Sequence, residues 1–239
     1  MQIAQQLTKK AKRQLRKEKV TLNTMPLIDI QPLTENQRRA FEAWYHGKDL
    51  FLHGCAGTGK TLMAFYFALR EVVLENCDKV LVVRSVVPSR DMGFLPGSEN
   101  EKMRNYELPY YSITEQLFNR SDAYEILKQK EAIEFTSTSF LRGLTFDNTT
   151  IIVDECQNLS WMELHTIMSR VGEGSRIIFC GDTAQSDLDE RKGKYDLNRM
   201  IEICKQMECF EFVNMTALDV VRSGKARQYI IACNALGYH

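Results

Sequence analysis

One short stretch constrains the fold of this chain more than any other, the segment at residues 51–61 that reads FLHGCAGTGKT. An apolar run precedes the glycines and a Lys-Thr pair follows them, in the spacing G-x-x-x-x-G-K-T of a loop that binds nucleotide phosphates. The backbone N–H groups of such a loop bind an anion at the N-terminus of the following helix. The segment therefore predicts a strand, a phosphate-binding loop and a helix, in that order.

Two side chains of this loop have chemical roles of their own. The Lys60 ammonium group is expected to contact the β- and γ-phosphates, and the Thr61 hydroxyl is expected to ligate Mg²⁺. The glycines let the backbone approach the phosphates closely. The motif predicts a nucleoside triphosphate site whose nucleotide-binding residues are Gly54, Cys55, Ala56, Gly57, Thr58, Gly59, Lys60 and Thr61.

Apolar runs alternate with amphipathic stretches along the rest of the chain. The run VLVV at residues 80–83 is apolar throughout, which is typical of a parallel strand covered on both faces. Strands alternating with helices predict an α/β fold, with a parallel β-sheet sandwiched by helices. We expect strands at 50–53, 80–83, 133–137, 151–153, 176–180 and 210–214. We expect helices from residue 34, at 60–75, in two short pieces within 112–130, and at 160–171, 194–206 and 224–236.

Two acidic residues follow the predicted strand at 151–153. Asp154, at the tip of that strand, is the expected partner of Thr61 around Mg²⁺. Glu155 is expected to point to the opposite side, where it accepts a proton from the attacking water or orients that water. A kinase with the same loop has less need of a second acid, so the pair favours hydrolysis.

Gln185 and two arginines are further candidates, each with a plainer alternative. Gln185 lies in the sequence GDTAQ after the strand at 176–180, where it is expected to bond the γ-phosphate or the water, unless the loop only caps a helix. Arg142 and Arg222 are candidate arginine fingers, or else surface residues in salt bridges. An extra cation at the transferring γ-phosphoryl group is worth about 10³–10⁵ in rate.

Gln37 has two competing interpretations. Thr34 is the expected N-cap of a helix and Gln37 lies three residues later, which is the spacing of a capping box. The Gln37 amide also offers a donor and an acceptor that match the edge of adenine. Both interpretations stay open at the level of sequence.

Charge divides the chain into an arm and a body. Residues 1–24 hold seven basic side chains and one acidic one, and they form a basic N-terminal arm in front of one domain at 25–239. The arm binds a phosphate backbone or is a solvated or neighbour-packed terminal helix, and its single thin apolar stripe slightly favours the second. Seven cysteines without a C-x-x-C pair, and no apolar run of about 20 residues, predict a cytoplasmic chain with no membrane contact.

Together these motifs resemble the PhoH family of P-loop ATPases, common in bacteria and their phages. The resemblance covers about residues 34–231. It rests on the order of five segments, GFLPG at 93–97, RG at 142–143, DECQN at 154–158, GDTAQSD at 181–187 and DVVR at 219–222. The family's core is similar to one RecA-like domain of superfamily 1 helicases. The resemblance therefore implies a P-loop NTPase fold with a single RecA-like core, and ATP as the nucleotide.

The resemblance also implies roles for single residues. Gln37 becomes the adenine-reading glutamine, Asp154 and Glu155 the Walker B pair, and Gln185 the γ-phosphate sensor. Arg222 aligns with a helicase arginine that reaches the phosphates across a cleft between two domains. Because the sequence contains one RecA-like domain only, the resemblance implies an oligomeric ring, a hexamer, in which a neighbour supplies this arginine.

The resulting prediction is an Mg²⁺-dependent ATPase that acts on single-stranded nucleic acid, RNA rather than DNA, in a helicase-like manner. Its expected contacts are Arg84, Ser85 and the loop at 86–97, since ligands bind at the carboxyl edge of a parallel sheet. The alternative is a nucleotide-driven switch or protein-remodelling ring with no nucleic-acid substrate. A nucleotide or small-molecule kinase is a weaker alternative, which Glu155 and Gln185 disfavour.

Overall fold

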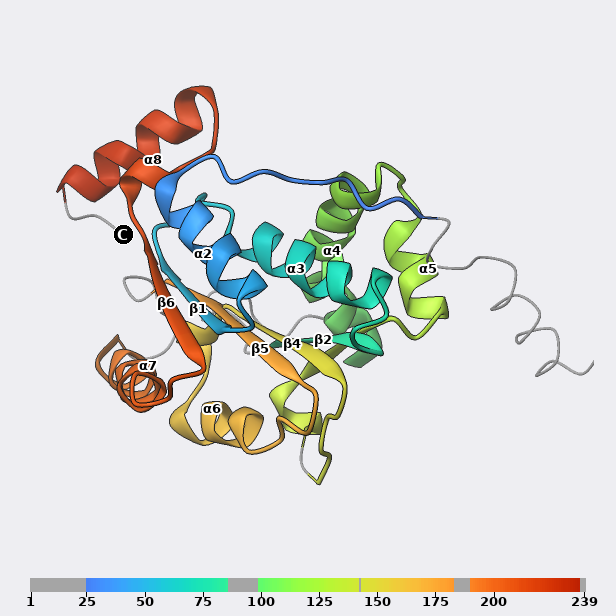
Figure 1. Ribbon diagram of the computed structural model, residues 1–239. Helices are drawn as coiled ribbons and strands as arrows, with labels where there is room; N and C mark the ends of the chain where they lie inside the picture. The colour runs from blue at the N-terminus through green and yellow to red at the C-terminus, as the bar shows by residue number, and fades with distance from the viewer. Residues whose placement is uncertain (1–24, 86–98, 142, 183–189, 237–239) are drawn as a thin grey trace, which may run out of the picture.

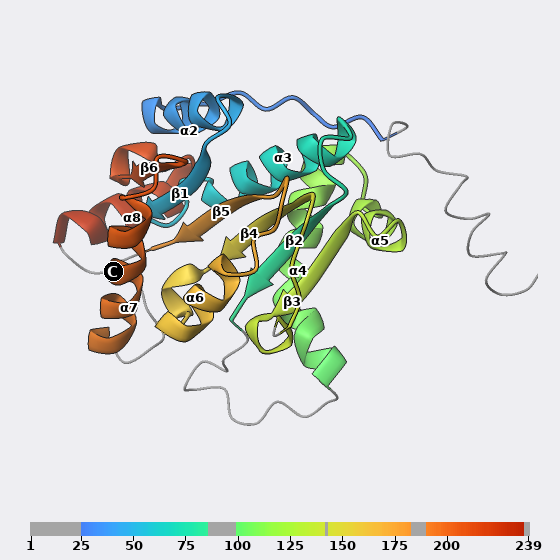
Figure 2. The same ribbon diagram turned by 60° about the horizontal axis from the view of Figure 1, so that its bottom comes forward.

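The computed structural model describes residues 25–85, 99–141, 143–182 and 190–236. At its centre is a sheet of six parallel strands in the order β3-β2-β4-β5-β1-β6 (Figures 1 and 2). The strand that leads into the glycine-rich loop, β1, is separated from β4 by β5. The strands are β1 Asp49–Gly54, β2 Lys79–Arg84, β3 Ile133–Ser137, β4 Thr149–Asp154, β5 Arg176–Gly181 and β6 Phe210–Met215.

Helices cover both faces of this sheet. They are α2 Glu35–Tyr45, α3 Lys60–Val73, α4 Glu99–Phe118, α5 Ala123–Gln129, α6 Trp161–Met168, α7 Glu190–Cys204 and α8 Gly224–Leu236. Helices α2 to α5 lie on one face and α6 and α7 on the other, while α8 follows β6 at the edge of the sheet (Figures 1 and 2). No helix within the described ranges is both long and apolar enough to cross a membrane.

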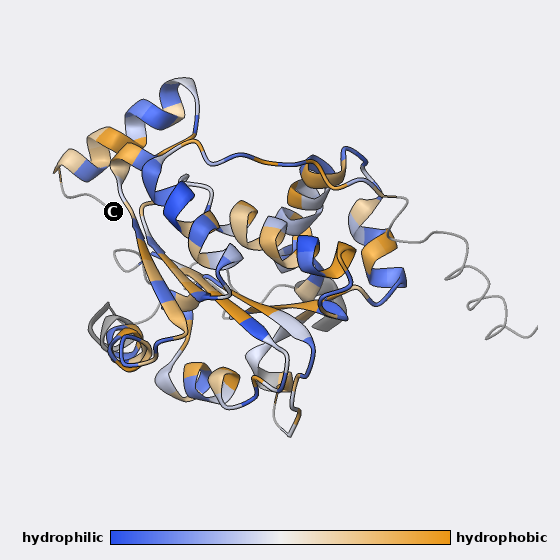
Figure 3. Cartoon of the chain, in the orientation of Figure 1, coloured by the Kyte–Doolittle hydropathy of each residue, from blue (hydrophilic) through white to orange (hydrophobic). Residues whose placement is uncertain are grey.

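The strands contribute to two separate cores because their side chains alternate between the faces of the sheet. Val80 and Val82 of β2 belong to the core beneath α2 to α5, whereas Leu81 and Val83 belong to the core beneath α6 and α7. All four side chains are fully buried. Figure 3 shows the hydrophobic strands lying between helices of mixed character. Burial on both faces explains why this run is apolar throughout.

The predicted strands are confirmed, each within two residues at either end. The predicted α/β fold, a parallel β-sheet sandwiched by helices with the glycine-rich loop between β1 and α3, is confirmed by the sheet and by the order of its elements. Apart from α4, two helix boundaries differ from the prediction by more than two residues. Helix α6 ends at Met168, because Val171 forms a β-bridge with Phe146 instead of continuing the helix. Helix α7 begins at Glu190, and its first three residues are Glu, Arg and Lys, all good helix formers.

The prediction of two short helical pieces within 112–130 is wrong for the first piece. Helix α4 spans Glu99–Phe118 and has Pro109 inside it. A proline removes one backbone hydrogen bond from a helix and normally ends it, which is why the sequence suggested a later start. Tyr110 and Leu117, on the buried side of α4, pack in the core beneath α3 and offset that loss. The predicted basic arm at 1–24 lies outside the described residues.

Candidate nucleotide site

The glycine-rich loop joins the end of β1 to the first turn of α3, and two glycines shape it. Gly54 has a φ of +111°, and a Cβ there would lie 2.0 Å from the backbone oxygen of Met215 in β6. The Cys55 N–H group donates to that same oxygen at 2.9 Å. Gly59 has a φ of +86° and is the N-cap of α3. The loop is therefore held against β6 at its start and enters a helix N-terminus at its end, an arrangement that binds anions.

Lys60, the first residue of α3, turns its side chain back over the loop. Its Nζ donates to the carbonyl oxygens of Gly54 at 2.6 Å and Cys55 at 2.7 Å. Thr58 Oγ1 also donates to the Cys55 oxygen, at 3.0 Å. The ammonium group thus lies within the arc of the loop, where the β- and γ-phosphates of a nucleotide bind in this motif.

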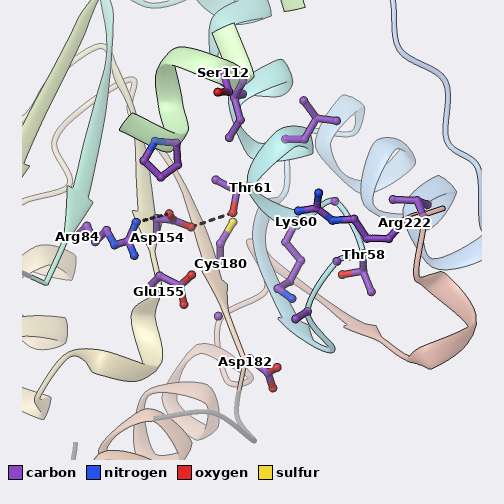
Figure 4. A pocket seen from close by; sticks show the side chains of 18 of the residues that line it. Thr58, Lys60, Thr61, Arg84, Ser112, Asp154, Glu155, Cys180, Asp182 and Arg222 are labelled. Carbon is purple, nitrogen blue, oxygen red and sulfur yellow. Dashed lines mark hydrogen bonds and ion pairs between the residues drawn. The ribbon is translucent and has the colours of Figure 1, made fainter. Parts of the chain in front are cut away.

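The structure brings together Thr61 and Asp154, the two residues predicted to hold Mg²⁺. Thr61 Oγ1 donates to Asp154 Oδ1 at 3.0 Å, a bond drawn as a dashed line in Figure 4. The Asp154 carboxylate is buried, and its pKa is raised above its ordinary value, first by this burial and then by the neighbouring Glu155. A hydroxyl and a carboxylate are oxygen ligands of the kind that Mg²⁺ prefers, so the pair fits this ion.

The second oxygen of Asp154 has two neighbours from other elements. Tyr110 Oη in α4 donates to Asp154 Oδ2 at 2.9 Å. The Nη1 atom of Arg84, at the end of β2, lies 4.0 Å from the same oxygen. Both neighbours favour the charged carboxylate and oppose the effect of burial on its pKa. Asp154 is therefore held by hydroxyls from two helices and lies beside one guanidinium group.

Glu155 leaves β4 in a left-handed conformation, with a φ of +51°. Its Oε2 accepts a 2.5 Å hydrogen bond from Gln157 Nε2, and Gln157 Oε1 accepts from the Asp182 N–H group at 3.1 Å. The prediction that Asp154 and Glu155 point to opposite sides is wrong, because both line the same cavity. The left-handed turn redirects the chain, so the alternation of a regular strand stops at Asp154.

Arg222 lies over the loop of its own chain. The Val221 N–H group donates to the Gly57 carbonyl at 3.1 Å, and a Cβ at Gly57 would lie 3.0 Å from Arg222 Cγ. The arginine is exposed, and Figure 4 shows it on the opposite side of the cavity from Arg84. The resemblance implies that a neighbouring subunit supplies this arginine, and that implication stays a prediction.

Gln37 ties the start of α2 to the loop, and the predicted capping box is wrong. Thr34 is the N-cap, since its Oγ1 accepts from the Gln37 N–H group at 3.3 Å. The Gln37 side chain accepts at Oε1 from the Leu33 N–H group at 2.7 Å and donates from Nε2 to the Thr58 carbonyl at 2.9 Å. It does so because α2 packs beside the loop, where the buried Thr58 carbonyl needs a donor.

These groups surround a cavity of about 680 Å³ at the carboxyl edge of the sheet (Figure 4). The loop forms one wall and α4 forms another. The cavity has the size of a small-molecule site. Of the predicted site residues, it is lined by Ala56, Gly57, Thr58, Gly59, Lys60, Thr61, Asp154, Glu155 and Arg222.

A family model described as PhoH-like protein matches residues 29–234. The chain belongs to the PhoH family. Over 81% of its length it is 31% identical to a PhoH-like protein of Synechocystis sp. and 32% identical to one of Bacillus subtilis, and it spans only 58% and 60% of these relatives. It is also similar to the solved structure of the large terminase from a thermophilic bacteriophage. That match has a TM-score of 0.46 and 10% identity, and covers 83% of this chain and 49% of the other.

In this PhoH-family chain, the two residues expected to contact nucleic acid, Arg84 and Ser85, lie at the carboxyl end of β2, and their contact with nucleic acid stays a prediction. Ser85 is buried. Arg84 lines the nucleotide cavity, with its guanidinium group 5.8 Å from the ring centre of Tyr106 in α4. It lies there because β2 and β4 pair in a register that places Arg84 beside Asp154. The loop at 86–97, Arg142 and Gln185 lie outside the described residues.

The wall formed by α4 is the part of the site that the sequence analysis missed. Pro109, Ser112, Ile113 and Gln116 line the cavity, and Tyr110 bonds Asp154 behind it. No motif identifies these residues, since Ser, Ile and Gln occur in many helices and a proline such as Pro109 argues against one. The only signal was the helical spacing of Tyr110, Thr114 and Leu117, all three fully buried.

Proposed function

We propose that this PhoH-family chain is a cytoplasmic ATPase that depends on Mg²⁺. The observation that carries the proposal is the 3.0 Å contact between Thr61 and Asp154, beside a loop that encloses the Lys60 ammonium group. In P-loop NTPases a lysine, a Ser or Thr hydroxyl and a strand-end aspartate hold the phosphates and the metal. Bound at this pair, Mg²⁺ would neutralise charge on the β- and γ-phosphate oxygens.

Glu155 is the proposed residue that orients the attacking water. Its carboxylate lines the cavity, and the bond from Gln157 limits its rotation. A carboxylate in this place accepts a proton from the water as the new bond to phosphorus forms. Gln185 is proposed as the γ-phosphate sensor, from its place in the sequence after β5. Transfer to a bound hydroxyl, the kinase reaction, has less need of the second acid.

Arg222 is proposed to contact the phosphates of its own chain. The bond between the Val221 N–H group and the Gly57 carbonyl holds its backbone to the loop. A cation preplaced in this way stabilises transition-state charge without reorganisation. Arg142 is the second candidate. The homo-oligomeric ring, a hexamer, is a separate proposal about assembly.

Gln37 is proposed to read the adenine base. Its bonds to Leu33 and Thr58 use one amide N–H and one lone pair of the carbonyl oxygen. A glutamine amide has two N–H donors and two lone pairs, so one of each is left for the adenine edge. Replacing Gln37 with Ala should then weaken the preference for ATP over GTP, which competition binding measures.

The proposed coupled substrate is single-stranded RNA, handled in a helicase-like manner, and the support for it is the family resemblance. A protein partner is the second candidate. It is favoured by α8, which buries none of its described side chains and exposes Tyr229 at 71% and Leu236 at 69%. Large exposed apolar side chains gathered on one helix often mark a protein contact.

The test of the proposed function is ATP turnover by the full chain, with and without single-stranded RNA, at one low salt concentration. Turnover that requires Mg²⁺ and rises strongly with RNA supports both halves of the proposal. Turnover that RNA leaves unchanged supports the ATPase and directs the search to a protein partner. Absence of ATP turnover under both conditions overturns the proposal.

A further inference from the structure

Tyr110 connects α4 to the carboxylate that the proposed function assigns to Mg²⁺. Its Oη donates to Asp154 Oδ2 at 2.9 Å, while Thr61 Oγ1 donates to Oδ1 at 3.0 Å. Each carboxylate oxygen therefore has its own hydroxyl donor, one from α4 and one from α3. Two donors on opposite oxygens fix the rotation of a carboxylate, which a single donor does not.

The Tyr110 ring is itself held on two sides. It stacks on Phe65 of α3, with ring centres 5.0 Å apart and planes 23° apart, and it packs against Phe135 of β3 at 5.8 Å. The whole side chain is buried. Its hydroxyl is thus placed by the packing of α4 on the sheet and on the helix that follows the phosphate-binding loop.

Because Arg84 lies nearby, the orientation of the Asp154 carboxylate depends on the Tyr110 hydroxyl. The Arg84 guanidinium group lies 4.0 Å from Asp154 Oδ2, the oxygen that Tyr110 bonds. Without the Tyr110 hydroxyl, Asp154 Oδ2 loses its hydrogen-bond donor, and we expect this buried oxygen to move toward the Arg84 guanidinium group. That rotation would move Oδ1 away from Thr61 and separate the two proposed metal ligands.

We propose that Tyr110 is a positioning residue for Mg²⁺ binding, and that through it the docking of α4 is coupled to the Mg²⁺–nucleotide complex. The inference rests on the proposed function. By linkage, whatever strengthens metal binding through this contact also stabilises α4 against the sheet. Ser112 and Gln116 of the same helix line the cavity. A bound nucleotide would therefore contact α4 directly, and the metal would act on α4 through Asp154 and Tyr110.

The test is Tyr110→Phe, which removes the hydroxyl and keeps the ring. Binding of a fluorescent ADP analogue is measured with excess Mg²⁺ and with EDTA, and the half-saturating Mg²⁺ concentration is measured alongside. We expect the Mg²⁺ requirement to rise about 10- to 100-fold, the usual result of removing a group that orients a metal ligand. Binding in EDTA is expected to stay unchanged. Adding Mg²⁺ to the ADP-bound protein should slow hydrogen exchange of α4 in the unmodified chain and not in the variant.

The matched control is Tyr111→Phe, one residue further along α4. The Tyr111 hydroxyl bonds Glu125 in α5 at 2.7 Å and takes no part in the site, so the control should bind Mg²⁺ and nucleotide normally. Equal weakening of binding in Mg²⁺ and in EDTA by Tyr110→Phe, or no change at all, overturns the inference. Thermal unfolding of both variants shows whether a loss of binding comes from misfolding. The half-saturating Mg²⁺ concentration is then compared at a temperature where both variants are folded.

Asp154→Asn separates this inference from the proposed function. If Asp154→Asn abolishes the Mg²⁺ dependence of ADP binding while Tyr110→Phe does not change it, the metal site stands and the role of Tyr110 is refuted. If Asp154→Asn leaves the Mg²⁺ dependence intact, the assignment of the metal site is itself wrong, and the inference falls with it.

Discussion

The two walls of the nucleotide cavity are built in different ways. The loop wall, residues 54–61, is one contiguous motif in which backbone angles, a lysine and a hydroxyl follow one another in sequence. The helix wall consists of α4 side chains that face the cavity only after α4 packs against α3 and the sheet. The loop wall carries the Lys60 charge, and the helix wall carries hydroxyl, amide and apolar groups. The comparison indicates that the reactive groups of this site come from one short stretch of sequence, whereas the groups that position them depend on tertiary packing.

The largest effect is expected in the loop wall, from Lys60→Ala. Because the Lys60 ammonium group lies within the arc of the loop, its loss should lower ATP turnover by at least about 10³-fold. Steady-state phosphate release measures this. Lys48→Ala is the control, since Lys48 lies at the other end of β1 and bonds the Glu208 carbonyl. Turnover close to that of the unmodified chain would contradict the central assignment.

Arg222 belongs to neither wall, and Arg222→Ala tests its contribution to turnover. Removing a cation from the γ-phosphate side should lower kcat by about 10³-fold, with Arg38→Ala, an exposed arginine paired with Glu35, as the control. Equimolar mixing of Arg222→Ala with Glu155→Gln chains then decides where the arginine acts. No recovery of turnover is expected if it serves its own chain. Recovery would show that a neighbouring subunit supplies it.

Glu155→Gln should separate binding from chemistry. The amide keeps the size of the side chain and loses the base, so kcat should fall about 10²-fold or more while the Kd for ATP stays within a factor of about three. Single-turnover hydrolysis and equilibrium binding measure the two quantities. A parallel loss of affinity and rate would instead assign Glu155 a structural part, through its bond with Gln157.

The smallest effect is expected in the helix wall, from Gln116→Ala. Gln116 lines the cavity and presents a neutral amide, so its loss should change kcat/KM by about three- to tenfold. Leu108→Ala is the control, because Leu108 is 55% exposed on α4 and lies outside the cavity lining. A loss as large as that from Lys60→Ala would break the comparison between a chemical wall and a positioning wall.

The sequence predicted the fold well because its strongest signals are local. An apolar run such as 80–83 marks a strand buried on both faces, and the glycine spacing marks the loop. The same locality explains the error at α4. Pro109 is a local signal against a helix, and the packing of Tyr110 on Phe65 that overrides it is a contact between distant segments.

The site residues that belong to a sequence motif could be predicted. Those placed by a backbone turn or by the register between two strands could not. Thr61 and Asp154 meet as expected, since both end motifs that face the same edge of the sheet. Glu155 turns into the cavity because of one left-handed backbone angle, which alternation along a strand does not foresee. Arg84 faces Asp154 because of strand register, and a single sequence does not reveal register.

The hydrogen bonds that hold the phosphate-binding loop determine when, during synthesis, the nucleotide site can form. The loop begins against the Met215 carbonyl, its Gly57 carbonyl bonds Val221, and Cys55 Sγ lies 3.1 Å from Asn234 Oδ1, 179 residues along the chain. Contacts of such sequence separation form late. During synthesis, the motif leaves the ribosome early, but its anion-binding geometry is completed only when β6 and α8 have arrived. Nucleotide can therefore stabilise the finished domain and not its N-terminal half.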